Sequence, residues 1–341
     1  MRQPRPLARR FTFLALVAVL ALVGASCSGG DDDESAPPPT APPTTVPPPT
    51  FPLTGRPATD EALLNRAPVT VKIDNNSASR PQAGLDKADL IYEEFTEGIT
   101  RFVVVFHSTD ADPVGPVRSV RPADPVIVYP LGGVFGFSGG SPAIRALVPG
   151  APVTAVDENA TDVMKRRSGR AAPHNLYTTV AGLAGKAPAG AKAPPKFADF
   201  LGPGQPFAAA GAVPGTHMDF RPAPSLSAAY DWDPGSSTWK RMTDGSPASL
   251  EGGGQIAPNN VIVQFTPYSQ FAQDSKVQYP EVIGSGEAWV FAAGQVVKGR
   301  WSKPDAGAVT AFTDANGAPI VLPPGQTFVH LVANGTAVTT R

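Results

Sequence analysis

The chain has 341 residues, with 28 Lys and Arg, 29 Asp and Glu, and a formal net charge of −1. This balance excludes a protein whose surface is built to hold nucleic acid or to cling to anionic lipid. Cys27 is the only cysteine, which excludes internal disulfides, so the folded part depends on its hydrophobic core.

The N-terminus has the pattern of a bacterial lipoprotein signal peptide. Four arginines precede an apolar run at 11–23, which is shorter than the roughly 20 residues of a membrane-spanning helix. Small residues at 24–26 form a cleavage site, and Cys27 follows where a lipoprotein accepts its acyl chains. We therefore predict a signal peptide at 1–26, lipidation of Cys27, and an extracytoplasmic protein anchored to the cell membrane.

A proline-rich tether is predicted to follow the lipidated cysteine over residues 27–57. Nine of the 16 residues from 37 to 52 are proline, a composition that favours an extended polyproline II chain without a core. Removal of the four signal-peptide arginines leaves 24 basic and 29 acidic residues, so the mature chain is mildly acidic.

The remaining sequence predicts a mixed α+β fold with two domains. Residues 58–200 alternate strand-like and helix-like segments, which predicts an α/β domain with a mixed sheet. Residues 201–341 are rich in Thr, Val, Trp and Tyr, which predicts a mainly antiparallel β domain. The segment 186–215 is dense in Pro, Gly and Ala, as a linker or long loop would be.

The elements of the first half are predicted from periodicity and capping residues. Ser141 is a good N-cap and Pro142 suits the first helical position, which predicts a helix at 142–148. We predict strands at 69–74, 134–137 and 153–156, a hairpin of 89–96 and 99–108 around Glu97 and Gly98, and a helix at 176–187.

Strands dominate the prediction for the second half. Alternation around Tyr230 and Trp232 predicts a strand, which returns from Trp239 after a turn at 233–235. Further strands are predicted at 260–265, 287–292, 295–301, 309–313, 319–322 and 327–332, with a hairpin turn at 314–317.

Ten sequence blocks resemble the YerB-type family of bacterial lipoproteins, whose two halves are both domains of unknown function. The resemblance implies a surface-exposed lipoprotein and carries no established activity. Pro125 and Pro130 depart from the family pattern and argue against a helix after Arg121. The blocks are VKIDN (71–75), SRPQAGLDKAD (79–89), EGITRF (97–102), VGPVRSVRP (114–122), GGSP (139–142), PHNLY (173–177), NNVIV (259–263), GRWSK (299–303), DANG (314–317) and LPPGQT (322–327).

An anion-binding site is the first hypothesis for chemistry. Free backbone amides at the start of the helix after Gly139, Gly140 and Ser141 suit a carboxylate or phosphate. Arginines offer a bidentate fork to the same groups, and the candidates are Arg118, Arg121, Arg80 and Arg101. The alternative is that Arg118 and Arg121 pair internally with Asp74, Glu93, Glu94 or Asp124.

A hydrolase is the second hypothesis. Ser138 lies in a Gly-x-Ser-x-Gly pattern between a strand and a helix, as a nucleophile elbow requires. His174 follows downstream, with Asp157 or Asp162 between them, which satisfies the chain order Ser, Asp, His. The alternative is a tight turn in which the glycines permit unusual backbone angles.

We predict neither a metal nor a cofactor. The four histidines are His107, His174, His217 and His330, and they form no close pair. The sequence thus favours an envelope lipoprotein that is not an enzyme and binds an anionic wall component, such as peptidoglycan, or an envelope protein. A cell-wall hydrolase or transferase using Ser138 or His174, and a structural scaffold, are the alternatives.

Overall fold

The computed structural model describes residues 48–341, which belong to a compact unit of residues 47–341. The predicted signal peptide, Cys27 and most of the predicted tether lie outside the described residues. Within them, no helix is both long enough and apolar enough to cross a membrane.

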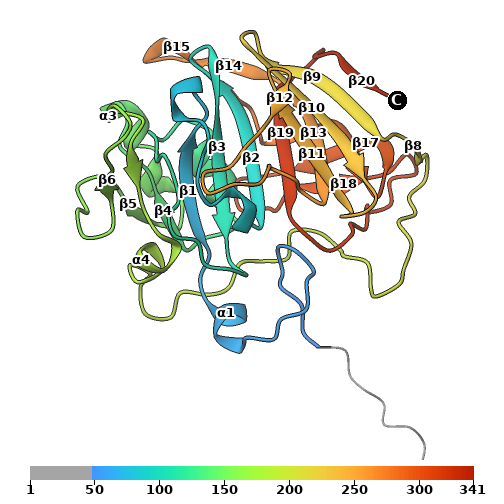
Figure 1. The fold of residues 1–341 in the computed structure, drawn as a ribbon, viewed down its shortest axis with the longest axis horizontal. Coiled ribbons are helices and arrows are strands. Elements are labelled where there is room, and N and C mark those ends of the chain that lie inside the picture. Colours follow the sequence, from blue (N-terminus) through green and yellow to red (C-terminus); the bar gives the residue numbers. More distant parts are fainter. Residues whose placement is uncertain (1–47) are drawn as a thin grey trace, which may run out of the picture. The chain divides into compact units, whose positions relative to one another are not determined.

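The first part of the chain alternates strands with short helices, as predicted (Figure 1). In chain order the elements are α1 (Glu61–Asn65), β1 (Val69–Asp74), η1 (Ser77–Ser79), η2 (Leu85–Lys87), β2 (Leu90–Thr96), β3 (Ile99–Phe106), α2 (Asp124–Val128), β4 (Val134–Gly136), α3 (Pro142–Arg145), η3 (Val148–Gly150), β5 (Thr154–Val156), β6 (Lys165–Arg166), β7 (Leu176–Tyr177) and α4 (Val180–Ala184).

The second part is made of strands. They are β8 (Val213–Pro214), β9 (His217–Ala223), β10 (Leu226–Asp233), β11 (Thr238–Thr243), β12 (Ser246–Pro247), β13 (Asn260–Thr266), β14 (Tyr268–Phe271), β15 (Asp274–Pro280), β16 (Gly284–Ala292), β17 (Gln295–Lys303), β18 (Ala311–Thr313), β19 (Thr327–Ala333) and β20 (Val338–Thr340).

A mixed sheet of 11 strands runs through both parts of the chain. Its order is β18-β17-β16-β13-β19-β2-β3-β1-β4-β5, with β8 beside β17. The parts meet where β19 pairs in parallel with β2, from Thr327 beside Leu90 to Leu331 beside Glu94. The mixed fold is therefore confirmed, while the domain boundary at residue 200 stays a prediction, since the two parts share this sheet.

A second, five-stranded sheet packs against the antiparallel end of the main sheet. Its order is β12-β11-β10-β9-β20, and all its paired strands are antiparallel. Tyr230 and Trp239 from this sheet are fully buried against Val263 and Phe291 of the main sheet. This layer corresponds to the predicted antiparallel β-rich region.

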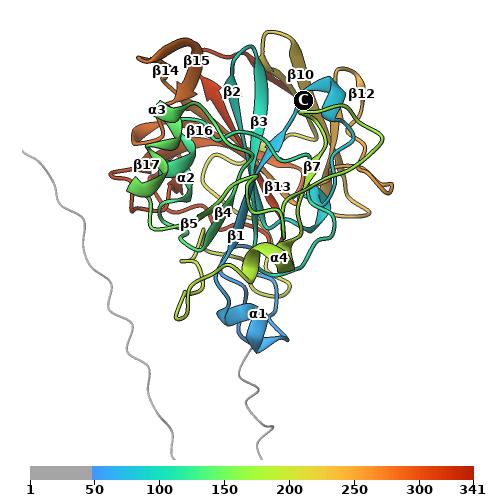
Figure 2. The ribbon, with the colours of Figure 1, turned by 90° about the vertical axis from the view of Figure 1, so that its left-hand side faces the viewer.

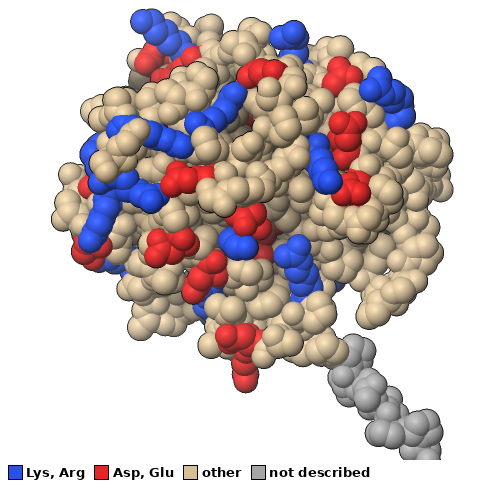
Figure 3. Space-filling view, in the orientation of Figure 1, with Lys and Arg blue, Asp and Glu red and all other residues tan. Residues whose placement is uncertain are grey.

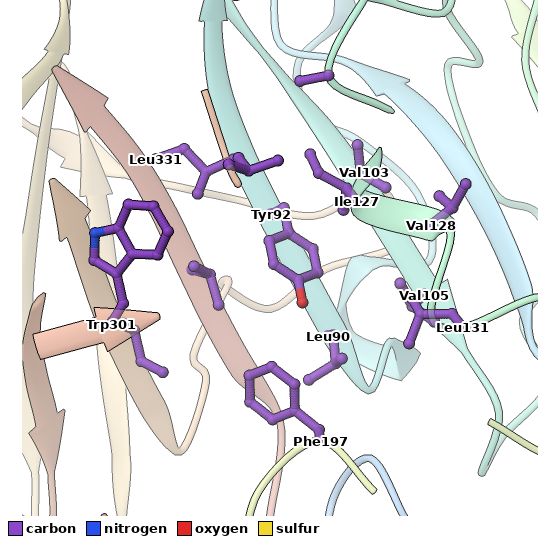
Figure 4. Close-up of a cluster of buried hydrophobic side chains, with 14 of the residues drawn as sticks. Leu90, Tyr92, Val103, Val105, Ile127, Val128, Leu131, Phe197, Trp301 and Leu331 are labelled. Carbon is purple, nitrogen blue, oxygen red and sulfur yellow. The ribbon is translucent and has the colours of Figure 1, made fainter. Parts of the chain in front are cut away.

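The main sheet has apolar cores on both faces because successive side chains of a strand point to opposite sides. On β2, Leu90 and Tyr92 join the core that also contains Trp301 and Leu331 (Figure 4). Ile91, between them, joins the core on the opposite face. A strand buried on both faces reads as a nearly continuous apolar run, which explains why the period-two signal is weak here.

Three local predictions were wrong. The stretch after Arg121 is helical, as α2, because Pro125 occupies its first turn, where no backbone donor is needed. The helix predicted at 176–187 starts later, because residues 176–177 form β7 and Thr179 caps the short helix α4. Residues 319–322 make only isolated bridges, through Pro319 and Leu322.

Candidate functional site

A polar hollow of about 400 Å³ contains most of the residues singled out in the sequence. Six predicted residues line it: Arg118, Arg121, Ser138, Gly139, Gly140 and Ser141. Asp274 and Val277 line it as well, from the hairpin β14–β15, which was not predicted. This hairpin lies next to α3 in both ribbon views (Figure 1, Figure 2), so both parts of the chain form the walls.

The hollow lies at the carboxyl end of the parallel strands β1, β4 and β5. Loops that follow parallel strands meet at the same edge of a sheet, which is where such sheets bind ligands. The segment around Arg118 crosses this edge between β1 and the loop after β4. The backbone amide of Arg118 donates to the carbonyl of Lys72 at 2.8 Å, and the carbonyl of Arg118 accepts from the amide of Ser138 at 2.8 Å.

The carboxylate of Asp74 holds two functional side chains at this edge. Its Oδ2 lies 2.6 Å from Nδ1 of His174 and 3.0 Å from Nε of Arg118. Asp74 is fully buried, whereas the side chains of Arg118 and His174 are partly exposed, by 18 and 19 %. The pairing of Arg118 with Asp74 was one of the internal pairs that the sequence left open.

Arg118 has unused hydrogen-bonding capacity that faces the hollow. Its Nε side is turned to Asp74, while Nη1 and Nη2 have no acceptor among the described residues. A guanidinium held on one side in this way presents its remaining donors in a fixed orientation. The arrangement can bind a carboxylate or phosphate through two parallel hydrogen bonds.

Arg121 and Arg101 are already neutralised by a shared carboxylate that the sequence did not suggest. Both form ion pairs with Oε2 of Glu97, and both arginine side chains are buried. Burial, together with the neighbouring charge of Arg121, lowers the pKa of Arg101 to about 10. Arg121 lines the hollow and Arg101 does not, and both arginines donate from Nη1 to a backbone carbonyl and from Nη2 to Glu97.

Arg80 lies away from the hollow. It forms an ion pair with Asp244 at 2.9 Å and donates from Nη2 to the carbonyl of Asn75 at 3.0 Å. These contacts connect the loop after β1 with the turn that follows β11. Arg80 therefore belongs to a contact between the two parts of the chain.

Backbone amides add donors beside Arg118. The amides of Gly139, Gly140 and Ser141 have no acceptor among the described residues. Gly139 and Gly140 have φ of 128° and 152°, and a Cβ on Gly140 would lie 3.0 Å from Val120. The helix that follows has only four residues, so an anion here would be bound by these amides and not by a helix dipole.

The residues of the hydrolase hypothesis are not hydrogen-bonded to one another. The hydroxyl of Ser138 lies 3.5 Å from that of Ser119, and Nδ1 of His174 is turned to Asp74. No hydrogen bond joins Ser138 to His174 within the described part of the chain. Asp157 pairs with Arg145 and Asp162 with Lys186, so neither orients His174.

The remaining histidines do not line the hollow. His107 and His330 are fully buried, and His217 pairs with Asp231 on the second sheet. Over residues 48–341, no three His, Cys, Asp or Glu side chains are grouped so that they could hold a metal ion.

Two charged features were not predicted from the sequence: the carboxylates that line the hollow and a basic surface beside it. Lys and Arg gather, with acidic residues among them, on the side that carries α3 and β6 (Figure 3). Lys165, Arg166, Arg167 and Arg170 lie within six positions of one another, a charge run that the sequence shows. Glu97 and Asp274 could not have been found in this way, since Glu97 lies in a hairpin turn and Asp274 at the start of a strand, each outside any charge run.

These features define a class: a mixed-sheet protein of two coupled parts with a polar hollow at the carboxyl edge of its parallel strands. The chain belongs to the DUF3048 family of proteins of unknown function. The family's N-terminal domain model matches residues 53–192, and its C-terminal domain model matches residues 217–329.

One relative and one solved structure extend the comparison. The chain is 27 % identical over 288 residues to the protein named "Putative lipoprotein YerB" of Bacillus subtilis (strain 168), covering 82 % of this chain and 85 % of the relative. The crystal structure of the YerB protein from Bacillus subtilis matches with a TM-score of 0.73 and 23 % identity, over 85 % of this chain and 99 % of that chain. The resemblance to the YerB-type family is confirmed, and the structural match supports the fold alone.

Proposed function

We propose that this protein is an extracytoplasmic lipoprotein, anchored through Cys27, that binds an anionic group of a wall component or protein partner in the hollow around Arg118. The pattern of residues 1–27 supports the anchor, and the lipoprotein name of the relative agrees with it. The proline-rich residues 37–52 would separate the folded unit from the membrane.

Arg118 is the observation that carries the binding proposal. Its guanidinium is oriented by a fully buried carboxylate and keeps two nitrogens without an acceptor among the described residues. Free amides of residues 139–141 and the hydroxyls of Ser119 and Ser138 lie on the same walls. This set of donors suits a carboxylate or a phosphate.

Binding can be measured by titration calorimetry and thermal unfolding with muropeptides and anionic wall polymers as probes. A ligand at 100 times its dissociation constant should add about 2.7 kcal/mol to the stability. Arg118→Gln should weaken binding by about 10- to 100-fold, because a hydrogen bond to a charged group contributes about 1.5–3 kcal/mol. Arg221→Gln, at an exposed residue of β9, is the matched control. Absence of binding by every probe would refute the proposal.

The anchor has its own test. In a bacterial host, the wild-type chain should incorporate labelled fatty acid and fractionate with the membrane, whereas Cys27→Ser should do neither. Incorporation of label by Cys27→Ser would show that the acylated position has been misidentified.

A hydrolase or transferase is a second candidate, because Asp74 orients His174 at 2.6 Å. A buried carboxylate that holds one imidazole nitrogen leaves the other available as a general base. Nε2 of His174 has no partner within residues 48–341. Release of soluble fragments from purified cell wall by the wild type but not by His174→Ala would support this candidate. Equal release by both would exclude it.

A further inference from the structure

The walls of the hollow carry balanced charge. Three of their arginines are paired with carboxylates: Arg121 with Glu97, Arg145 with Asp157 and Arg166 with Glu158. Arg118 and Asp274 also line the walls, and with the buried Arg101 and Asp74 this makes five arginines and five carboxylates around the site. A polyanion would therefore meet as many repulsive as attractive groups.

One cationic donor and one carboxylate on these walls have no partner of opposite charge open to the hollow among the described residues. The donor is Arg118, whose Nη1 and Nη2 have no acceptor among the described residues. The acceptor is Asp274, at the start of β15 in the other part of the chain. Its Oδ1 accepts from the amide of Lys276 at 3.1 Å, and residues 48–341 provide no cation within ion-pair distance of it.

We propose that the hollow recognises a zwitterionic ligand, a peptide with a free ammonium and a free carboxylate. The carboxylate binds the open donors of Arg118 and the amides of residues 139–141, and the ammonium binds Asp274. Such a ligand has no net charge, which matches the balanced walls, and it uses both open groups. A bound anion that lacks an ammonium group would leave the carboxylate of Asp274 without a partner and close to a like charge.

This inference rests on the proposed anion site and names its ligand class. Two sources supply such a peptide: the D-amino-acid stems of a cell wall and the L-peptides of proteins. Arg118 and Asp274 would bind the charged ends of either kind of peptide, since the positions of two charges alone do not select a stereoisomer. Matched D- and L-peptides can distinguish them.

The test uses alanine oligomers of two to four residues, in D and L forms, added to the compact unit that begins at residue 47. Each oligomer is compared with its N-acetylated and its C-amidated derivative by titration calorimetry. We expect either modification to weaken binding by about tenfold or more, because each removes one charge-assisted contact. Equal affinity for free and N-acetylated oligomers would overturn the zwitterion proposal.

Variants test which residue binds each charged group of the ligand. Asp274→Asn should bind free and N-acetylated oligomers equally, whereas Arg118→Gln should lose the preference for a free carboxylate. Asp231→Asn, an exposed carboxylate of the second sheet, should leave both preferences unchanged. Asp274 is exposed on a hairpin, so its variant is expected to fold, which circular dichroism and thermal unfolding can verify.

The outcomes separate this inference from the anion site. Acetate, inorganic phosphate and N-acetylated oligomers could bind as well as the free oligomers, with their binding weakened by Arg118→Gln and not by Asp274→Asn. In that case the anion site stands and the zwitterion proposal fails. If no oligomer and no anion binds, both fail. Binding that requires the free amine and Asp274 supports both.

Discussion

Asp74 Oδ2 and His174 Nδ1 lie 2.6 Å apart although 100 positions separate the two residues in the chain. The contact ties the loop before β7 to the end of β1, a central strand of the main sheet. The same oxygen faces Nε of Arg118 at 3.0 Å. One buried carboxylate thereby positions the imidazole and the guanidinium at the hollow.

Asp74→Asn should reduce the free energy of unfolding by about 3 kcal/mol, because removing one member of a buried ion pair leaves the others uncompensated. Urea denaturation measures the loss. Asp231→Asn is the control, since Asp231 lies 2.7 Å from His217 but is 60 % exposed. Its loss should stay below about 1 kcal/mol, as for other surface pairs. Equal losses for the two variants would mean that the burial of Asp74 does not strengthen its contribution to stability.

Glu94 should make stability depend on pH. Burial raises its pKa from 4.5 to about 7, and the charge of Asp124 adds to this, while Lys72 between them opposes it. A raised pKa in the folded state means that the contribution to stability is full below pH 4.5 and is lost as the pH rises to 7.

The effect is isolated by comparing wild type with Glu94→Gln, which stays neutral throughout. From about pH 4.5 to pH 7 the free energy of unfolding of the wild type should fall relative to that of the variant. Urea titrations at half-unit intervals provide both curves. Parallel curves would show that Glu94 is ionised in the folded protein throughout this range.

Glu93 and Arg241 join the two sheets. Arg241 Nη1 on β11 lies 2.9 Å from Glu93 Oε2 on β2, and both side chains are fully buried. Burial alone would raise the pKa of Glu93, but the charge of Arg241 holds it well below its ordinary value. The pair therefore stays ionised at neutral pH.

Arg241→Met should cost about 3–5 kcal/mol of unfolding free energy, because Glu93 is left as an uncompensated buried charge. Combining it with Glu93→Gln should recover part of this loss, with a coupling of about 0.5–3 kcal/mol between neighbouring sites. Arg221→Met, at an exposed residue of β9, is the control. Strictly additive losses would contradict a direct interaction.

Gly133 should be intolerant of any side chain. Its φ is 76°, and a Cβ there would lie 2.1 Å from the carbonyl oxygen of Pro68, where β1 and β4 begin to pair. Gly98 has a φ of 81° and nothing within 4 Å of a Cβ, so it isolates the backbone effect.

Gly98→Ala should cost about 1–2 kcal/mol, the strain of a left-handed residue with a Cβ. Gly133→Ala should cost clearly more, because the clash involves backbone atoms of a packed strand. Thermal unfolding of both variants gives the comparison. Similar losses would mean that the start of β4 moves easily away from Pro68.

Local sequence determined the elements whose signals are local. The alternation at 69–74, the Glu97-Gly98 turn and the Ser141 cap each act within a few residues, and the structure contains each of them. Residues of the hollow were also found from local features, because arginines and glycines after strands are visible in a chain. The signal-peptide pattern of residues 1–27 is readable for the same reason.

Only the tertiary structure decided how these pieces combine. The pairing of β19 with β2, the partner of Arg121 and the place of Asp274 depend on contacts between residues that lie far apart in the sequence. Such contacts form when sheets pack and exclude water, so no short pattern encodes them. Sequence by itself determined which residues could hold an anion, and packing decided that, of the four candidate arginines, Arg118 alone keeps both Nη nitrogens without an acceptor within the described part of the chain.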